Sequence, residues 1–332
     1  MKIESMVLNE ARNVTLTAYI QSVGGEFDGI TRRPAVLIIP GGGYHFCSDR
    51  EAEPVALPYL KAGYQAFILR YSLNEQAVWP NPLNDYEQAM ERIRGEAETW
   101  HVVPDRIAVV GFSAGGHLAA CAATMAAERP NAAILGYPVI DGACAHDYLT
   151  SAPDVPSAVD ARTCPCFVFA TRTDNLVPVE NALHMVDALC RHDIAFESHI
   201  YSNGPHGLST GDPCINSGRF CGRYPSWVED SIDWLRDVLG GLNAGGLTEP
   251  RFGSRINGNR EAALNLDCSM QFLMEHPEGR KVLDEVLGEG WKNACPAAAR
   301  HVITLRDSLA YMGIPSETAS DLEARLNAIP NT

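Results

Sequence analysis

The stretch Gly111-Phe112-Ser113-Ala114-Gly115-Gly116-His117 carries the pattern Gly-x-Ser-x-Gly within a chain of 332 residues. The apolar run at 106–110 predicts a buried strand before it, and the small residues at 118–125 predict a helix packed closely on a sheet after it. On so sharp a turn, both glycines of the pattern must lack side chains so that strand and helix can approach each other. The stretch therefore predicts a nucleophile elbow, with the Ser113 hydroxyl projecting above the sheet.

The composition is typical of a soluble globular protein, with 46% hydrophobic and 20% charged residues. The formal net charge of −15 argues against nucleic acid and against an anionic membrane as partners. No apolar run approaches the length of a membrane span, and the first residues lack the apolar segment of a signal peptide. We therefore expect a cytoplasmic protein.

The ten cysteines are scattered along the chain, and none of them forms a Cys-x-x-Cys pair. The pair at Cys164 and Cys166 is too closely spaced for a zinc site. Most of the others lie in apolar contexts, which favours reduced and buried thiols. Cys214 and Cys221 share one loop, and the sequence leaves open whether they pair. We expect no metal site.

Apolar runs alternate with helical segments along residues 1–240, which predicts an α/β fold. The pattern indicates a mostly parallel eight-stranded sheet flanked by helices, with functional residues at the carboxyl ends of the strands. At residues 48–51 the pattern Ser-x-x-Glu predicts a capping box that opens the first helix. Strands are predicted at 3–8, 14–20, 35–39, 66–71, 106–110, 131–138, 166–171 and 195–201, and helices at 48–60, 85–100, 118–125, 179–191 and 227–239.

Three consecutive glycines follow the predicted strand at 35–39 directly, in Pro40-Gly41-Gly42-Gly43-Tyr44. Glycines leave backbone N–H groups without side-chain cover, and an oxyanion hole requires such groups. A flexible loop is the alternative, but a triple glycine rarely comes immediately after a core strand. The stretch therefore favours an oxyanion loop that serves Ser113.

Ser113, Asp174 and His206 follow successive predicted strands in this order along the chain. The order nucleophile, acid, base is that of the α/β-hydrolases. His206 has the chemistry of a general base that takes the serine proton and later returns it to the leaving group. Asp174 would hold the imidazole in the right tautomer and stabilise the imidazolium.

Each of these assignments has a competitor. His117 falls in the predicted elbow helix, and His199 lies in the middle of a predicted strand, so neither suits the base as well as His206 does. Asp141 also follows a strand. We prefer Asp174 because the acid is usually supplied by the loop after the penultimate strand.

Six linked motifs resemble those of the acetyl xylan esterase and feruloyl esterase-like α/β-hydrolases, which are relatives of the hormone-sensitive-lipase group. The resemblance covers about residues 1–240 and implies an α/β-hydrolase fold and a serine carboxylesterase that needs no metal or other cofactor. It also implies substrates among acetylated plant-polysaccharide fragments. The motifs are 40–44, 48–56, 111–118, 137–140, 174–181 and 206–208.

The resemblance implies the triad named above and an oxyanion hole formed by the backbone N–H groups of Gly42, Gly43 and Ala114. This chain has Pro40 where the lipase relatives have a histidine. That histidine is not the catalytic base, so the implied mechanism is unaffected. The short segment after Asp141 suggests a reduced cap and an open site.

Bulky side chains near the predicted oxyanion loop are candidates for binding the substrate. Tyr44, His45 and Phe46 follow the glycines, and Trp79 lies in a proline-containing loop that fits either a pocket wall or simple packing. We expect these groups to shorten the acyl pocket and to favour acetyl over longer acyl groups.

The sequence therefore predicts a serine esterase that removes acetyl groups from short sugar chains of the xylan type. A feruloyl esterase is one alternative. A prolyl-peptidase-like hydrolase is another, because its elbow is also Gly-x-Ser-x-Gly-Gly, although no propeller-like repeats precede the elbow here. A catalytically silent α/β-hydrolase that serves as a binding module is the third, and the presence of all three triad residue types argues against it.

The chain changes character after Gly240. Residues 241–260 are rich in glycine and asparagine and predict a linker between a catalytic domain at 1–240 and a helical segment at 261–332. In that segment, apolar residues at helical spacing predict about three amphipathic helices, at 261–287, 297–312 and 316–329. We expect them to help a homodimer form and to border the open active site.

Overall fold

The computed structural model describes residues 1–253 and 255–331. The chain divides into two compact units, Met1–Ser254 and Arg255–Thr332, and each is described here by itself. Among the described residues, no helix is both long enough and apolar enough to cross a bilayer.

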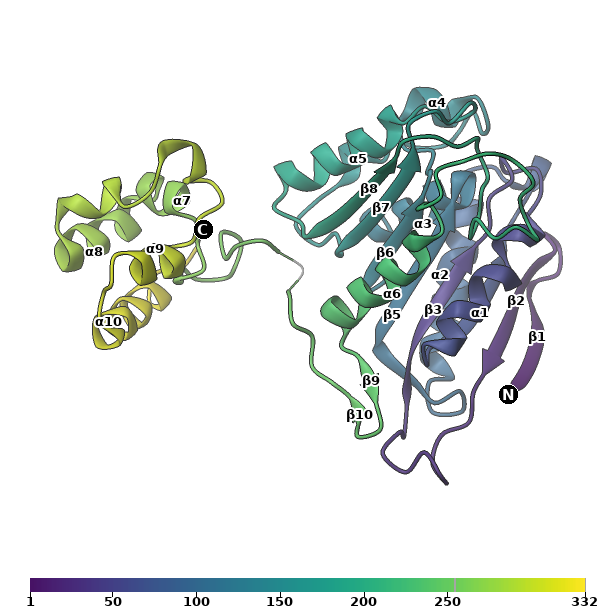
Figure 1. Ribbon diagram of the computed structural model, residues 1–332, viewed down its shortest axis with the longest axis horizontal. Coiled ribbons are helices and arrows are strands. Elements are labelled where there is room, and N and C mark those ends of the chain that lie inside the picture. The colour runs from purple at the N-terminus through teal and green to yellow at the C-terminus, as the bar shows by residue number, and fades with distance from the viewer. Residues whose placement is uncertain (254, 332) are drawn as a thin grey trace. The chain divides into compact units, whose positions relative to one another are not determined.

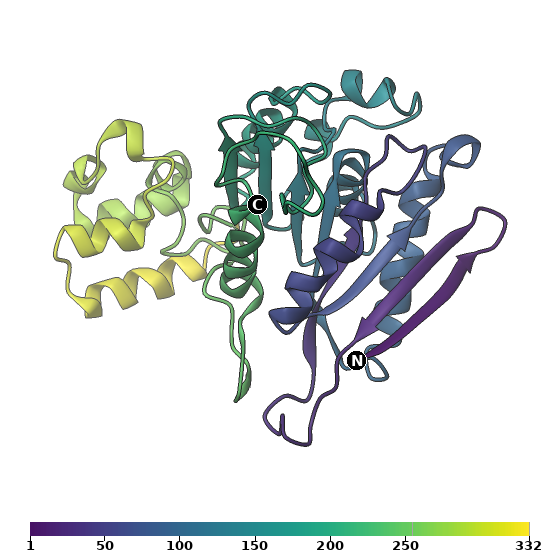
Figure 2. The same ribbon diagram turned by 45° about the vertical axis from the view of Figure 1, so that its right-hand side comes forward.

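The first unit is built on one eight-stranded sheet with the strand order β1-β2-β4-β3-β5-β6-β7-β8. Only the pairings of β1 with β2 and of β2 with β4 are antiparallel, and the antiparallel hairpin lies at one edge of the sheet (purple in Figure 2). All other neighbours are parallel, so the predicted mostly parallel sheet is confirmed. The strands are β1 (Lys2–Asn9), β2 (Val14–Ile20), β3 (Arg33–Ile39), β4 (Gln65–Arg70), β5 (Val102–Phe112), β6 (Ala132–Gly136), β7 (Cys166–Thr171) and β8 (Phe196–Tyr201).

Helices pack on the sheet, and those after β3, β5 and β7 connect parallel strands. Helices α1 and α6 lie side by side in front of the sheet in Figure 1, where the Tyr59 hydroxyl lies 2.8 Å from the Ser231 hydroxyl. The α-helices of this unit are α1 (Glu53–Lys61), α2 (Asn81–Gly95), α3 (Ser113–Thr124), α4 (Gly142–His146), α5 (Glu180–Arg191) and α6 (Ser226–Leu239).

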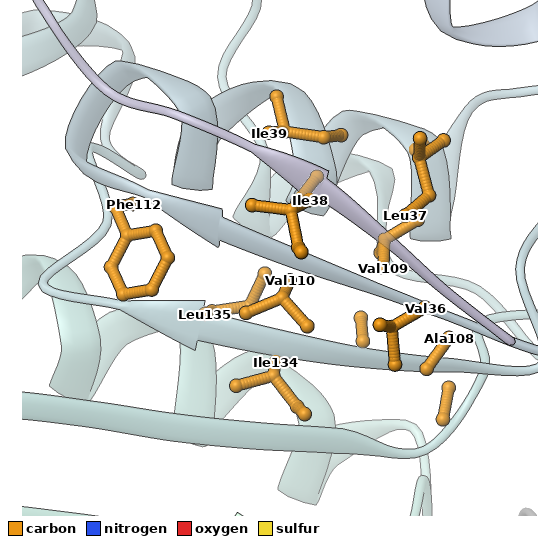
Figure 3. Packing of buried hydrophobic residues seen from close by; sticks show 14 of the residues in the cluster. Val36, Leu37, Ile38, Ile39, Ala108, Val109, Val110, Phe112, Ile134 and Leu135 are labelled. Atoms are coloured by element: carbon orange, nitrogen blue, oxygen red, sulfur yellow. The ribbon is translucent and has the colours of Figure 1, made fainter. Parts of the chain in front are cut away.

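The core lies in the middle of the sheet. Ile38, Val110 and Ile134 are register partners on the adjacent strands β3, β5 and β6, so their side chains share one face (Figure 3). All three are fully buried. Because helices cover both faces, these central strands are continuous apolar runs rather than alternating ones.

The capping box predicted at residues 48–51 does not form. Residues Asp49–Glu51 are a short 3₁₀ helix, and Ser48 makes no side-chain cap hydrogen bond. The α-helix begins only at Glu53. The physical reason is that Glu51 turns into the protein, where its carboxylate accepts hydrogen bonds from the Gly41 N–H and the Tyr137 hydroxyl.

Two boundaries in the first unit also differ from the prediction. Helix α2 covers Asn81–Gly95 instead of 85–100, because a proline fits in the first helical turn, where its missing N–H costs nothing. The predicted linker at 241–260 contains the hairpin of β9 (Leu242–Asn243) and β10 (Gly246–Leu247). The first unit therefore extends beyond residue 240. Cys214 and Cys221 are both free thiols.

In the part of the second unit that the structure describes, there are four α-helices where about three were predicted. Residues 261–287 hold two of them, because Pro277 starts a new helix and His276 before it is extended. The apolar side chains of this unit pack on one another around Trp291, which is 1% exposed. The helices are α7 (Met270–Glu275), α8 (Pro277–Leu287), α9 (Leu305–Tyr311) and α10 (Ser316–Asn327).

Candidate active site

Ser113 lies at the junction of β5 and α3, at the carboxyl end of a central strand. Its φ angle is 52°, in the left-handed region that a residue with a side chain seldom adopts. A Cβ atom at Gly111 would lie 2.3 Å from the Gly115 carbonyl oxygen, and one at Gly115 would lie 2.2 Å from the Ile39 carbonyl oxygen. Close backbone contacts thus require both glycines, and the turn has the geometry of the predicted elbow.

The structure brings the three predicted triad residues into one hydrogen-bonded chain. His206 Nε2 is 2.9 Å from Ser113 Oγ, and His206 Nδ1 is 2.8 Å from Asp174 Oδ2. Ser113 is 7% exposed, and the side chains of His206 and Asp174 are 12% and 1% exposed. An imidazole that donates from Nδ1 to the carboxylate leaves Nε2 free to accept the serine proton.

Asp174 is held in place by its second oxygen. Asp174 Oδ1 accepts hydrogen bonds from the backbone N–H groups of Leu176 and Val177, both at 2.9 Å. The neighbouring Asn175 side chain accepts one from the backbone N–H of His206 at 3.0 Å. The loops after β7 and β8 are therefore joined to each other directly at the site.

The competing residues lie elsewhere. Asp141 contacts His184 Nδ1 at 2.9 Å. His199 contacts Glu197 at 2.8 Å and stacks on the Phe167 ring, with the ring centroids 5.0 Å apart. Their side chains have partners of their own and do not enter the hydrogen-bonded chain at Ser113.

His117, the third competitor, is fully buried beneath the elbow. Its Nε2 is 2.9 Å from the Pro153 carbonyl oxygen, which can only accept, so Nε2 carries the proton. Its Nδ1 is 2.7 Å from the Tyr44 hydroxyl and accepts from it. Burial lowers the pKa of His117 from its ordinary 6.5 to about 4, because the charged imidazolium would lose its hydration.

This depressed pKa predicts a loss of stability in mild acid. The unfolded chain takes up the proton near pH 6.5, whereas the folded chain resists it until about pH 4. The stability that His117 contributes is therefore complete above that window and falls by about 1.4 kcal/mol per pH unit within it. Urea unfolding of wild type and His117→Gln between pH 7 and pH 4 measures the difference. Equal slopes of unfolding free energy against pH in the two proteins would contradict the assignment.

The glycine loop presents unengaged backbone donors beside Ser113. Gly42 and Gly43 have φ angles of 138° and 62°, which a side chain would oppose. The carbonyl oxygens of Gly41 and Gly42 accept hydrogen bonds from Ser48 and His45 at 2.9 and 3.0 Å. Among the described residues, the N–H groups of Gly42 and Gly43 have no hydrogen-bond partner. They are free to donate to a negatively charged oxygen.

Ala114 is the second residue of α3, directly after Ser113. The first N–H groups of a helix have no partner within the helix, and they lie at the positive end of its dipole. Ala114 N–H is thus suited to the same role as the glycine N–H groups.

A cavity of about 520 Å³ opens above Ser113 and His206. Its apolar wall includes Phe46, Tyr148 and Leu176. Phe46 is 59% exposed, so this wall is accessible to a ligand. His45 also lines the cavity, and its role in substrate binding stays a prediction.

Tyr44 and Trp79 do not line this cavity, which corrects their prediction as substrate-binding residues. Tyr44 is 2% exposed, and its ring packs edge-on against Tyr71 with centroids 5.7 Å apart. Trp79 lies beside His117, with ring centroids 5.9 Å apart. The His117 imidazole accepts a hydrogen bond from the Tyr44 hydroxyl, so Tyr44 belongs to the core, and Trp79 is a partly buried residue that packs against that core.

Sequence reasoning missed several residues around the site. Tyr148 lines the cavity but lies in an irregular segment without a motif. Leu176 lines it from within the motif at 174–181, where the sequence assigned only the acid of the triad. Glu51 and Tyr137 lie within motifs that the sequence singled out, but Glu51 was interpreted as a helix cap. Their position behind the glycine loop depends on contacts between distant segments, which no local pattern signals.

The chain is similar in sequence to known esterases and to a xylanase. Residues 28–152 match the family model BD-FAE. Endo-1,4-beta-xylanase B of Butyrivibrio fibrisolvens is 30% identical over 223 residues, which cover 58% of this chain and 35% of that protein. The acetylxylan esterase of Xylanibacter ruminicola is 30% identical over 228 residues, which cover 61% of this chain and 45% of that protein. The chain thus matches less than half the length of either relative.

A solved structure of an alpha/beta hydrolase is similar to a large part of this chain. MGS-M1, an alpha/beta hydrolase enzyme from a Medee basin deep-sea metagenome library, has a TM-score of 0.68 and 45% sequence identity. The match covers 72% of this chain and 98% of that chain.

Proposed function

Since the chain belongs to the α/β-hydrolase esterases, we propose that it is a serine carboxylesterase with Ser113 as nucleophile, His206 as general base and Asp174 as the acid of the triad. The observation that carries the proposal is the hydrogen-bonded chain of these three side chains beside a glycine loop with unengaged N–H groups. The proposed substrates are acetyl esters of xylan-type oligosaccharides.

In the acylation step, His206 Nε2 takes the hydroxyl proton as Ser113 Oγ bonds to the acyl carbonyl carbon. Negative charge moves to the carbonyl oxygen and a tetrahedral intermediate forms. When the intermediate collapses, the bond between the carbonyl carbon and the sugar oxygen breaks, and the imidazolium returns its proton to that oxygen. The products are a free sugar hydroxyl and an acyl group on Ser113.

Deacylation repeats these transfers with water in place of the serine hydroxyl. His206 takes a proton from water as the water oxygen attacks the acyl carbon, and the proton then returns to Ser113 Oγ as acetic acid leaves. Asp174 stays ionised throughout and stabilises the imidazolium that forms in each half of the reaction.

The oxyanion of both intermediates is proposed to accept hydrogen bonds from the backbone N–H groups of Gly42, Gly43 and Ala114. Fixed donors of this kind need no reorganisation as the charge develops, which makes them effective in a partly buried site. The unengaged state of the two glycine N–H groups supports this assignment.

The choice of acetylated sugars rests on two further observations. The relatives named acetylxylan esterase and endo-1,4-beta-xylanase B associate this kind of chain with xylan. The cavity is larger than an acetyl group needs, so its remaining volume can hold the alcohol part of the ester. The same aromatic wall of Phe46 and Tyr148 would also accept an aromatic acyl group, which keeps a feruloyl esterase as the second candidate.

Acyl length should discriminate between substrates. We expect kcat/KM for nitrophenyl esters to fall from acetyl to butyryl to octanoyl, because Phe46 and Tyr148 limit the space around the glycine loop. Each methylene group is worth only about 1–3 kcal/mol, so the preference should be clear but not absolute. Acetate release from acetylated xylo-oligosaccharides, with the Ser113→Ala variant as the blank for spontaneous hydrolysis, tests the sugar part of the proposal.

Other outcomes would change the assignment. Rates that peak with long acyl chains would indicate a lipase-like enzyme, and a strong preference for feruloyl esters would select the second candidate. Cleavage of peptides after proline without ester turnover would select a peptidase. Failure of Ser113 to react with a fluorophosphonate, together with absent ester turnover, would point to a silent binding module.

A further inference from the structure

Behind the glycine loop, a glutamate carboxylate lies in the protein interior. Glu51 is 3% exposed and follows the loop by only a few residues. No salt bridge involves Glu51 among the described residues. A buried carboxylate is costly unless hydrogen bonds compensate for its lost hydration, so its contacts require an explanation.

The carboxylate joins the two loops on which the proposed reaction depends. Glu51 Oε2 accepts a hydrogen bond from the Gly41 N–H at 2.8 Å. Glu51 Oε1 accepts one from the Tyr137 hydroxyl at 2.5 Å. The Tyr137 oxygen in turn accepts one from the backbone N–H of Ser209, three residues after His206, at 3.0 Å. A continuous set of hydrogen bonds therefore runs from the oxyanion loop to the histidine loop.

The directions of these hydrogen bonds identify Glu51 as an acceptor at both oxygens. A backbone N–H can only donate, so Gly41 donates to one oxygen and Ser209 donates to Tyr137. With its oxygen already accepting from Ser209, Tyr137 directs its own proton to Glu51. The arrangement is that of an ionised carboxylate. Burial raises the pKa of Glu51, and the hydrogen bonds from Tyr137 and Gly41 oppose that rise.

Additional contacts place this network against the reacting groups. The Tyr137 ring packs edge-on against the His206 ring, with centroids 4.9 Å apart. At Gly41, a Cβ atom would lie 2.9 Å from Ser113 Cβ, so the loop passes directly beside the elbow. The Ser209 hydroxyl donates to the carbonyl oxygen of Arg50, next to Glu51 in the chain. Small shifts of Gly41 or Ser209 would therefore displace the groups next to Ser113 and His206.

We propose that Glu51, acting through Tyr137, is a positioning residue that sets the oxyanion loop and the His206 loop relative to Ser113. The inference rests on the proposed esterase function and adds a residue to it. Glu51 does not touch the substrate. By fixing the peptide at Gly41, it orients the next N–H groups of the loop, and by fixing Ser209 through Tyr137, it limits movement of the imidazole.

Glu51→Gln is the direct test, because glutamine keeps the size of the side chain but adds an N–H group where two acceptor oxygens are needed. We expect kcat to fall on the order of 10- to 100-fold while KM changes by less than about threefold, since oriented donors act mainly on the transition state. A fold defect alone would instead lower the active fraction, which active-site titration with a fluorophosphonate measures separately.

Glu53→Gln is the matched control. Glu53 is two residues away and also accepts from a tyrosine, Tyr19, at 2.8 Å, but this pair is exposed on the surface. We expect its kcat and KM to equal those of wild type. If Glu51→Gln does not fold, Tyr137→Phe tests the same link, with kcat again falling more than KM rises.

A double variant of Glu51→Gln and Tyr137→Phe distinguishes one network from two independent effects. A combined loss in kcat smaller than the product of the single losses is expected if both residues act through the same hydrogen bonds. Strict multiplicativity, or kcat in Glu51→Gln equal to that of the Glu53→Gln control, would overturn the proposal while leaving the esterase function intact.

A spectroscopic measurement tests the positioning role of Glu51 independently of ester hydrolysis. The proton on His206 Nδ1 should give a far-downfield ¹H NMR resonance, which we expect to move in Glu51→Gln and to stay unchanged in Glu53→Gln. If wild type hydrolyses no ester, the proposed function fails, and this resonance still tests the coupling. An unchanged resonance in Glu51→Gln would then overturn the positioning role.

Discussion

Ser113→Ala is expected to lower kcat by a factor on the order of 10⁴ or more while the fold stays intact, because no other group can form the acyl-enzyme. Alanine removes only the hydroxyl, and the left-handed backbone at this position persists. Steady-state hydrolysis of nitrophenyl acetate measures the loss, and circular dichroism checks the fold. His206→Ala should cause nearly the same loss, because it removes the base that lies 2.9 Å from the serine oxygen.

Ser157→Ala is a suitable control for this experiment, since Ser157 is exposed and its hydroxyl donates a hydrogen bond to the Asp154 carbonyl oxygen at 3.1 Å. It should retain the wild-type kcat. Retention of more than about a hundredth of the wild-type rate in Ser113→Ala would exceed what the oxyanion hole and substrate binding supply alone, and it would rule out Ser113 as the nucleophile.

Asp174→Asn is expected to lower kcat by a factor on the order of 10³ to 10⁴. The amide can present an N–H group to His206 Nδ1, which favours the tautomer with its proton on Nε2. That tautomer cannot accept the Ser113 proton. The backbone donors at Leu176 and Val177 should still hold the amide oxygen, so the geometry of the loop is retained. Measurement of kcat/KM against pH shows whether the loss persists across the active range.

Asp141→Asn separates the two carboxylates that the sequence left in competition. Asp141 contacts His184, whose side chain is 57% exposed, and we expect its replacement to leave kcat unchanged. If Asp141→Asn lowered kcat as much as Asp174→Asn does, or if Asp174→Asn retained the wild-type kcat, the assignment of Asp174 as the acid of the triad would be wrong.

Local patterns in the sequence were sufficient for the architecture. The continuous apolar run at β3 predicts a strand that is buried on both faces. The alternation of strands and helices along the chain predicts a parallel sheet, because each helix connects two parallel strands. The sequence also predicted the elbow, since only glycine allows the close backbone contacts at Gly111 and Gly115. The order of Ser113, Asp174 and His206 along the chain indicated which loops would carry polar groups to one edge of the sheet.

Short-range patterns failed where a local preference competed with a distant partner. Ser-x-x-Glu at 48–51 satisfies the rule for a helix cap, yet Glu51 is bound by Gly41 and Tyr137 instead. Tyr44 directly follows the glycines and was expected at the substrate, yet its hydroxyl bonds to His117 in the core. In both cases a buried polar group is satisfied by a residue that the sequence does not place nearby.

The sequence by itself determined the eight-stranded sheet, the elbow and the residues most suited to reaction chemistry. Only the tertiary structure decided that His206 lies 2.9 Å from Ser113, and that His45 and Phe46, not Tyr44 and Trp79, face the cavity. Secondary structure follows from the period of apolar residues along the chain. The distances in a site depend instead on how loops from several strands pack and satisfy their buried polar groups, which becomes defined only when the chain is folded.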